Sequence, residues 1–423
     1  MMRFLLYALA IMGALAVLSW LYSLIVPEPA DRVPSKLVGE EVTDFDPLDV
    51  LSAQTTSPVT DRNQIELLVN GEDIFPPMLE AIEDADETVE FLTFIYWQGE
   101  IALQFADALS AAAERGVKVR ILLDAFGAGK MSDVLVERLE AAGCEVAWYH
   151  PLSWYTLKRL NNRTHRKVLV VDREVGFTGG VGIAEEWTGT AQDPEHWRDN
   201  HFRVRGPVVR HLHAAFAENW RRATGEVLTH PIPTKQLAGG RARAAPLATS
   251  PRGKESDIGV MYWLLLMRAQ ETIDIATPYF VPDSDMLDAI TATAERGVRV
   301  RILVPGPHLD KKVVQWASYA SFDDLIDAGV EVWEYQPTMM HVKSVVADGR
   351  WSVIGSANFD NRSFELNDEL VLLVDDPRLA EEVTEHFEED LEQSRRMSRA
   401  EISRIRLYKR LLIWAALTVQ EHL

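Results

Sequence analysis

The chain has 423 residues, a formal net charge of −21, 47% hydrophobic residues and a single cysteine, Cys144. This length predicts two domains, and the apolar fraction excludes wholesale disorder and collagen-like repetition. One cysteine excludes an intramolecular disulfide framework and a cysteine-based zinc knuckle. The acidic charge disfavours a broad nucleic-acid-binding face, so no nucleic-acid partner is expected, and an anionic substrate has to be held by a local basic site.

Residues 1–27 are predicted to form a transmembrane anchor. Residues 4–26 are 23 uncharged, mostly apolar residues, and a helix of that length spans roughly 34 Å, enough for a bilayer core. A cleaved signal peptide is the weaker alternative, because its apolar region is about 7–15 residues long and ends at a small-residue cleavage site. We expect a single-pass protein of the cell (inner) membrane. Basic residues on both sides of the segment leave its orientation open.

Residues 28–62, rich in Pro, Ser, Thr and acidic residues, are predicted to be a linker. The body that follows contains two diverged copies of one unit: residues 113–122 recur at 294–303, and residues 142–146 recur at 328–332. Each copy alternates strand patterns with helical patterns that stop at glycine, which predicts an α/β fold with two mixed β-sheets flanked by helices. The predicted boundaries are 63–230 for the first domain, 231–256 for an inter-domain loop and 257–394 for the second domain.

Residues 395–423 are predicted to form a basic amphipathic tail. Between positions 395 and 410 the tail carries seven Lys or Arg residues and one Glu, and an apolar, Trp-containing run follows. Such a helix suits the membrane interface. A solvated helix docked on the body is the alternative. If the tail binds the membrane interface, the acidic body is repelled by anionic lipid while the anchor and the tail keep the site close to the membrane.

Both copies carry one polar pattern at the same point. In an extended segment the side chains at i and i+2 share a face, so each His and Lys should point together, while the apolar runs 168–171 and 344–347 return the chain to the core. A single His-x-Lys is usually a surface strand, but two at equivalent places in a duplicated domain favour a functional site. Each Asp is interpreted as a support for the following turn. The residues are His165, Lys167 and Asp172, then Gly179 and Gly180, in the first copy, and His341, Lys343 and Asp348, then Gly355, Ser356 and Asn358, in the second.

This double motif resembles the signature of the phospholipase D superfamily. The second copy matches it throughout, with Asn367 and Glu369 completing the pattern, whereas the first has Gly180 where serine is common and Gly182 in place of asparagine. Instead of Asn-x-Glu the first copy has Trp-Arg-Asp199, which resembles the cardiolipin synthase branch, as do the segments 179–186 and 276–282. The resemblance covers about residues 63–394 and implies a duplicated phospholipase D-like domain with the active site between the halves.

The resemblance further implies that two imidazoles act on one phosphodiester. His165 would be the nucleophile that forms a phosphohistidine and His341 the acid and base, although the pseudo-symmetry leaves the reverse assignment open. No metal or other cofactor is expected, because lysines supply the positive charge. Lys167, Lys343 and Asn358 would stabilise the phosphate, Asp199 and Glu369 would orient the imidazoles, and Gly180, Ser356 and Asn367 are the further supporting positions.

The expected function is transfer of a phosphatidyl group from phosphatidylglycerol to a second phospholipid, with release of glycerol. Hydrolysis to phosphatidate at the same site is the alternative, because the outcome depends on whether water or a lipid alcohol reaches the intermediate. A nuclease is disfavoured by the charge and the anchor, and a non-catalytic scaffold by the two intact His/Lys pairs. No oligomeric state is predicted.

Three further patterns are weaker. Residues 126–130 resemble a phosphate-binding loop but lack the required Gly at 124 and Ser or Thr at 131. His211 and His213 are interpreted as part of a solvated helix face and not as a metal pair. Several aromatic residues could line a groove, although core packing is the preferred interpretation for them: Tyr96, Trp97, Trp154, Tyr155, Tyr279 and Phe280.

Overall fold

The computed structural model describes residues 45–151, 162–229, 240–250 and 257–405. The predicted anchor, the first part of the predicted linker and the end of the predicted tail lie outside the described residues. Within the described ranges, no helix combines the length and the apolar character needed to span a bilayer.

The first copy contributes a mixed set of strands, in which β2, β3 and β4 are parallel neighbours and the others pair antiparallel. The predicted apolar run 168–171 is one of them and is fully buried. The strands of this copy are β1 (Thr60–Val69), β2 (Thr88–Thr93), β3 (Lys118–Asp124), β4 (Glu145–Tyr149), β5 (Val168–Val171), β6 (Val175–Gly179) and β7 (Asn200–Arg205).

The second copy repeats this arrangement, with β9, β11 and β12 as its parallel neighbours, and adds the edge strand β17 next to β12. A separate two-stranded sheet pairs β10 (Phe280–Val281) with β15 (Phe359–Asp360). The strands of the main sheet from this copy are β8 (Ala242–Thr249), β9 (Thr272–Ala276), β11 (Arg299–Pro305), β12 (Glu331–Tyr335), β13 (Ser344–Ala347), β14 (Trp351–Gly355), β16 (Glu369–Asp375) and β17 (Ser394–Arg396).

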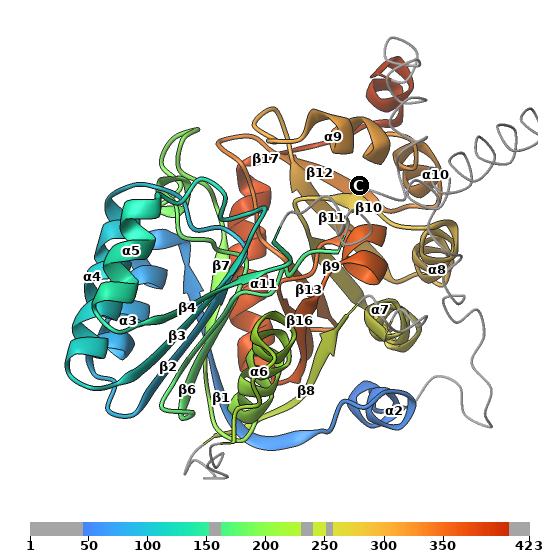
Figure 1. The fold of residues 1–423 in the computed structure, drawn as a ribbon. Coiled ribbons are helices and arrows are strands. Elements are labelled where there is room, and N and C mark those ends of the chain that lie inside the picture. The colour runs from blue at the N-terminus through green and yellow to red at the C-terminus, as the bar shows by residue number, and fades with distance from the viewer. Residues whose placement is uncertain (1–44, 152–161, 230–239, 251–256, 406–423) are drawn as a thin grey trace, which may run out of the picture.

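The two predicted sheets are fused into one. Among the described residues, 15 strands follow the order β17-β12-β11-β9-β13-β14-β16-β8-β1-β7-β6-β5-β2-β3-β4. The expectation of two separate sheets was therefore wrong, because β1 and β8 pair antiparallel where the copies meet. Figure 1 shows the two sets of strands side by side, with β1 and β8 at the lower centre.

β8 also corrects the predicted inter-domain loop 231–256, because residues 242–249 within it form a strand. The segment is rich in alanine, a poor strand former, and flanked by glycines, which is why its sequence indicated a loop. It becomes a strand because both of its edges are paired, to β16 and to β1. Residues 47–54 and 60–62 of the predicted linker likewise belong to a helix and to β1.

Helices cover the sheet. α3, α4 and α5 lie on the outer side of the first copy's strands in Figure 1, and α7 and α8 cover those of the second copy. The inner helices α6 and α11 share one apolar cluster with strands of both copies. The helices are α2 (Pro47–Gln54), α3 (Asn70–Glu83), α4 (Glu100–Glu114), α5 (Asp133–Ala141), α6 (Val209–Thr224), α7 (Asp257–Arg268), α8 (Ser284–Glu295), α9 (Lys312–Ser318), α10 (Phe322–Asp327) and α11 (Pro377–Glu392), with a 3-10 turn at Glu185–Trp187 and a π-helical turn at Arg362–Leu366.

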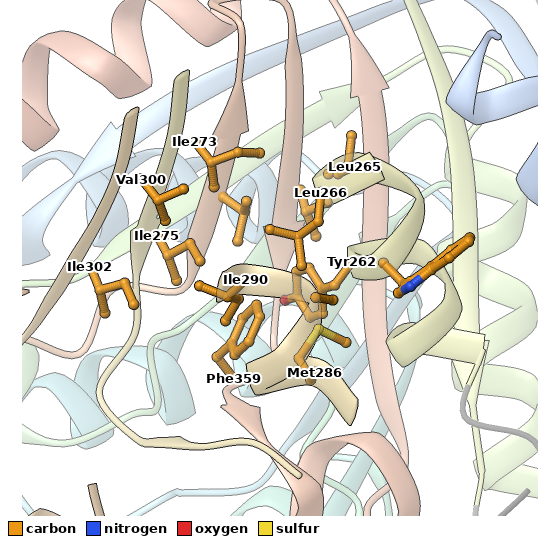
Figure 2. Packing of buried hydrophobic residues seen from close by; sticks show 14 of the residues in the cluster. Tyr262, Leu265, Leu266, Ile273, Ile275, Met286, Ile290, Val300, Ile302 and Phe359 are labelled. Carbon is orange, nitrogen blue, oxygen red and sulfur yellow. The ribbon is translucent and has the colours of Figure 1, made fainter. Parts of the chain in front are cut away.

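The repeated Ala-Glu-Arg-Gly segments end equivalent helices. α4 and α8 each stop two residues before a glycine, and Gly116 and Gly297 have φ of 95° and 93°, which glycine adopts without the penalty of a Cβ. The next strand then returns to the sheet. Figure 2 shows the resulting core in the second copy, where Leu266 of α7 and Ile290 of α8 pack against Ile275 of β9.

The beginning of the predicted tail is docked on the body. β17 pairs with β12, and Arg395 lies 2.7 Å from Glu334, whose side chain is 5% exposed. Arg399 lies 2.9 Å from Asp327. For these residues the docked alternative is correct, because β17 extends the sheet and carboxylates of the second copy, the buried Glu334 and the exposed Asp327, pair with the two arginines. The tail beyond residue 405 lies outside the described residues.

Candidate active site

The histidine segment of each copy is held by the other copy. The backbone N–H of His165 donates to the carbonyl of Asp368 over 2.9 Å, and that of His341 donates to the carbonyl of Arg198 over 2.7 Å. Single bridges, Thr164 to Asp368 and Arg198 to Met340, add to these contacts. The two crossed pairings bring both motifs to one place between the copies.

The side chains of the two histidines also contact the opposite copy. Nδ1 of His165 lies 3.0 Å from Oε1 of Glu369, and Nδ1 of His341 lies 2.7 Å from Oδ2 of Asp199. Each predicted orienting carboxylate therefore contacts the imidazole of the opposite copy. With Nδ1 held by a carboxylate, Nε2 of each ring is the nitrogen that can react with a substrate, although Nζ of Lys343 lies 3.3 Å from that of His341.

The departure of the first copy from the common pattern has a steric explanation. A Cβ on Gly180 would lie 2.1 Å from Oδ1 of Asp199, so the carboxylate occupies the space in which a serine side chain would lie. In the second copy Ser356 fills the equivalent space and its hydroxyl donates to Glu369. Asp199 directly precedes β7 as Glu369 begins β16, so the two carboxylates are structural equivalents despite their different spacing.

Glu369 has a larger set of donors than the sequence indicated. Besides Ser356, the hydroxyl of Ser363 donates to its Oε1 over 2.9 Å, and Nδ2 of Asn367 lies 3.4 Å from the same oxygen. Ser363 was missed because it lies in a π-helical turn with no counterpart in the first copy. Asp199 is held instead by the indole N–H of Trp187 at 2.9 Å.

The motif lysines are buried beside the imidazoles. Nζ of Lys343 lies 3.0 Å from Nδ1 and 3.3 Å from Nε2 of His341, and Nζ of Lys167 donates to the carbonyl of His165 over 2.8 Å. Both lysine side chains are 4% exposed. In the second copy His and Lys point together, as predicted; in the first copy the ammonium group of Lys167 contacts the backbone of His165, and both side chains line one cavity.

The two motif aspartates support turns, as expected, and lie away from the imidazoles. Asp172 accepts from the backbone N–H groups of residues 86–88, and Asp348 from those of residues 270–272. Their φ values of 51° and 49° are left-handed, a conformation that Asp tolerates better than most residues. Each aspartate ties the hairpin after the motif to the start of the neighbouring strand.

Burial and neighbouring charges shift the pKa values of the two histidine–carboxylate pairs differently. Burial, followed by the motif lysines, lowers the pKa of His165 well below its usual value, and burial followed by Lys343 lowers the pKa of His341 to about 4. Burial raises the pKa of Glu369 to about 7. Burial also opposes ionisation of Asp199, but His341 and Lys343 outweigh it and lower the pKa of Asp199. Asp199 therefore stays ionised to a lower pH than Glu369.

A cavity of about 560 Å³ opens onto both imidazoles. Among the aromatic candidates, Trp97 and Tyr279 line this cavity, whereas Tyr96 and Phe280 are core residues. Trp154 and Tyr155 lie outside the described residues. The other lining residues include Phe94, Phe126, Lys130, Arg163, Lys167, Trp187, Trp197, Asp310, Lys311, Asn358, Arg362 and Asn367.

Two weaker sequence interpretations have clear outcomes. The loop at 126–130 is no P-loop, since Asp124 accepts from the N–H groups of Phe126, Gly127 and Thr164 and so ties this loop to the His165 segment. The solvated-face interpretation of His213 was wrong. Its side chain is buried with Nδ1 2.6 Å from Glu90, because it faces the sheet from α6.

Comparisons with known proteins agree with the site. The family model described as "Cardiolipin synthase, PLD-like domain" matches residues 78–220 and 263–391. A cardiolipin synthase of Geobacillus kaustophilus is 37% identical over 317 residues, which are 74% of this chain and 63% of that protein. The chain thus spans less than two thirds of that relative. The probable cardiolipin synthase YwiE of Bacillus subtilis is 34% identical over 347 residues, 80% of this chain and 68% of that protein.

Among solved structures, the chain is similar to a phosphatidylserine synthase of Haemophilus influenzae. The TM-score is 0.69 over 89% of this chain and 100% of that chain, at 15% sequence identity. At this identity the likeness concerns the fold alone, and it extends across both copies.

Proposed function

The chain belongs to the cardiolipin synthase family with phospholipase D-like domains, and from this premise we propose that it is a membrane-bound phosphatidyltransferase. It would take the phosphatidyl group of phosphatidylglycerol, release glycerol and pass the group to the hydroxyl of a second phospholipid. One observation carries the proposal: two imidazoles, each bonded to a buried carboxylate of the opposite copy, open onto one cavity beside buried lysines.

In this mechanism Nε2 of His165 attacks the phosphorus of the donor and a phosphohistidine forms. His341 gives a proton to the departing glycerol oxygen, and then takes one from the acceptor hydroxyl as this attacks and the P–N bond breaks. Lys167, Lys343 and Asn358 face the non-bridging oxygens and stabilise the charge that develops there.

The charges of the two pairs favour this assignment over its reverse. The nucleophile has to be neutral, and the pKa of His165 is well below its usual value beside a Glu369 whose pKa is raised to about 7. The acid has to be protonated. Burial and Lys343 lower the pKa of His341 to about 4 in the free protein, but its contact with the ionised Asp199 and the negative charge of a bound phosphodiester both raise that pKa. Environments that separate two titratable pairs in this way are typical of an acid and a nucleophile with distinct roles.

The aromatic lining of the cavity favours a lipid alcohol over water as the acceptor. Trp187 and Trp197 lie 5.4 Å and 5.6 Å from the ring of His341, and Phe94 lies 5.4 Å from that of His165, by ring centroids. Apolar rings around the imidazoles limit the access of water to the intermediate. Hydrolysis to phosphatidate remains the competing outcome, and a nuclease is disfavoured by the net charge of −21.

We further propose that the protein is held in the inner membrane by the anchor predicted over residues 1–27. The site then meets its lipid substrates in the plane of the bilayer.

The test uses the full-length protein in mixed micelles of detergent and phosphatidylglycerol, with EDTA present. We expect a four-chain lipid and free glycerol in equal amounts. Phosphatidate as the main product would replace transfer by hydrolysis, and cleavage of oligonucleotides without any lipid turnover would contradict the lipid substrate. His165→Ala should remove both the turnover and the acid-labile phosphoprotein.

A further inference from the structure

Two lysines at the mouth of the cavity are related by the internal repeat. Lys130 and Lys311 each lie twelve residues after the first residue of an equivalent strand, β3 from 118 and β11 from 299. Both are exposed, and both line the cavity that holds the two imidazoles. The duplication has therefore placed one cation from each copy at the same opening.

Each of these lysines rests on an aromatic ring of its own copy. Nζ of Lys130 lies 3.6 Å from the ring centroid of Trp97, and Nζ of Lys311 lies 4.9 Å from that of Tyr279. Trp97 is itself fixed by its indole N–H, which donates to the carbonyl of Gly127 over 2.9 Å. Among the described residues neither lysine forms an ion pair with a carboxylate, so the ring contact positions the ammonium group and leaves its charge available.

The cavity holds more positive charge than one phosphodiester requires. Five cationic side chains but one carboxylate, Asp310, occur among the described lining residues, although the whole chain carries −21. The hydroxyl of Tyr279 donates to Asp310 over 2.9 Å. Arg163 is buried, and its guanidinium donates to the carbonyl of His150. Lys167 lies at the imidazoles. The exposed cations of the mouth are thus additional to the charge that the reacting phosphate needs.

We propose that Lys130 and Lys311 form a second phosphate site, which holds the phosphate of the acceptor during transfer. This rests on the proposed function and names the acceptor class: an anionic phospholipid, whose own phosphate is separated from its attacking hydroxyl by a short glycerol chain. The hydroxyl oxygen bonds to the phosphorus on His165, the P–N bond breaks and His341 takes the proton, while the lysines hold the second phosphate in place. The same lysines hold that phosphate in the product, which carries two.

The experiment compares two acceptors for one phosphohistidine. Full-length protein is incubated with phosphatidylglycerol micelles and isotope-labelled glycerol. Labelled phosphatidylglycerol then reports transfer to glycerol, which has no phosphate, and the four-chain lipid reports transfer to an anionic acceptor. Both products form from the same phosphohistidine, so their ratio depends on how well each acceptor is bound and not on any step before the intermediate.

In the double variant Lys130→Gln/Lys311→Gln we expect this ratio to fall about 10- to 150-fold, the range of a lost hydrogen bond to a charged group. Incorporation of labelled glycerol should stay within about threefold of the wild type. The Lys130→Arg/Lys311→Arg variant, which keeps the charge, should restore most of the four-chain product.

Lys118 and Lys312 provide a matched control. Both are exposed, and neither lines the cavity: Lys118 begins β3 and pairs with Glu145, and Lys312 begins α9 next to Lys311 and donates to the carbonyl of Pro307. Lys118→Gln/Lys312→Gln should leave the product ratio unchanged. An unchanged ratio in the Lys130/Lys311 variant, or an equal loss of both products, would overturn the second phosphate site. If the wild type makes neither product, the proposed function itself fails.

Discussion

Gly180→Ala is the substitution whose effect the geometry defines most closely. The added Cβ would lie 2.1 Å from Oδ1 and 2.5 Å from Oδ2 of Asp199, so the carboxylate has to move. It is 0% exposed, and it currently accepts from Trp187 at 2.9 Å and contacts Nδ1 of His341 at 2.7 Å. The φ of Gly180 is not left-handed, so the substitution acts through this clash and not through backbone strain.

The expected loss follows from the contact between Asp199 and His341. A hydrogen bond to a charged group contributes about 1.5–3 kcal/mol, and each 1.36 kcal/mol in the barrier is tenfold in rate. Gly180→Ala should therefore lower kcat by about 10- to 150-fold while the chain still folds. The assay is initial-rate formation of the four-chain lipid, with thermal unfolding measured in parallel.

A double-mutant cycle separates this cause from a general effect of the substitution. Asp199→Ala removes the carboxylate and makes room for a Cβ at position 180, so Gly180→Ala should add less than about twofold to the loss in that background. Multiplicative losses in the double variant would refute the steric argument, and so would full activity of Gly180→Ala alone.

Three other predictions concern charge and burial. Because burial lowers the pKa of Lys343 to about 8, this cation is lost as the pH rises through that value, so kcat/KM should decline above pH about 8, and Lys343→Arg should move that decline to higher pH; an unchanged alkaline limb would contradict the role of this lysine. Asp274→Ala removes the bidentate partner of the buried Arg301 at 2.6 and 2.7 Å and leaves only Glu388, so it should cost about 1.5–3 kcal/mol in denaturant unfolding, whereas Lys118→Gln, which removes an exposed pair, should cost less than about 1 kcal/mol. Equal losses of stability in the two variants would contradict the expectation that a buried ion pair contributes more than an exposed one. Cys144 is buried and its pKa is raised to about 11 by burial, so it should resist thiol reagents in the native protein, and Cys144→Ala should keep full activity; rapid labelling would mean that this part of the core opens readily.

The repeat made much of the fold and site predictable. Similar segments in the two copies predicted equivalent strands and glycine-terminated helices, and the paired His-x-Lys motifs predicted a shared site. The supporting role of Asp172 and Asp348 also followed from their place at the end of a buried strand. These features are local, so their signals lie within short stretches of sequence.

Features that depend on long-range pairing were not predictable in the same way. The sequence contains both Asp199 and Glu369 but does not tell which imidazole each one serves, because the crossing depends on how the copies meet. The strand β8 was missed for the same reason, since its alanines become a strand only between β1 and β16. His213 is polar, and its burial depends on Glu90 facing it from another element.

The central claim is that a phosphatidyl group passes through His165. The most direct measurement is a single-turnover reaction with phosphatidylglycerol, quenched under conditions that preserve phosphohistidine and followed by mass spectrometry of the peptides. We predict a burst of glycerol equal to the amount of enzyme, an adduct on His165, and no adduct in His165→Ala. An adduct on His341 would reverse the assignment of the two imidazoles, and glycerol release without any adduct on histidine would contradict the account.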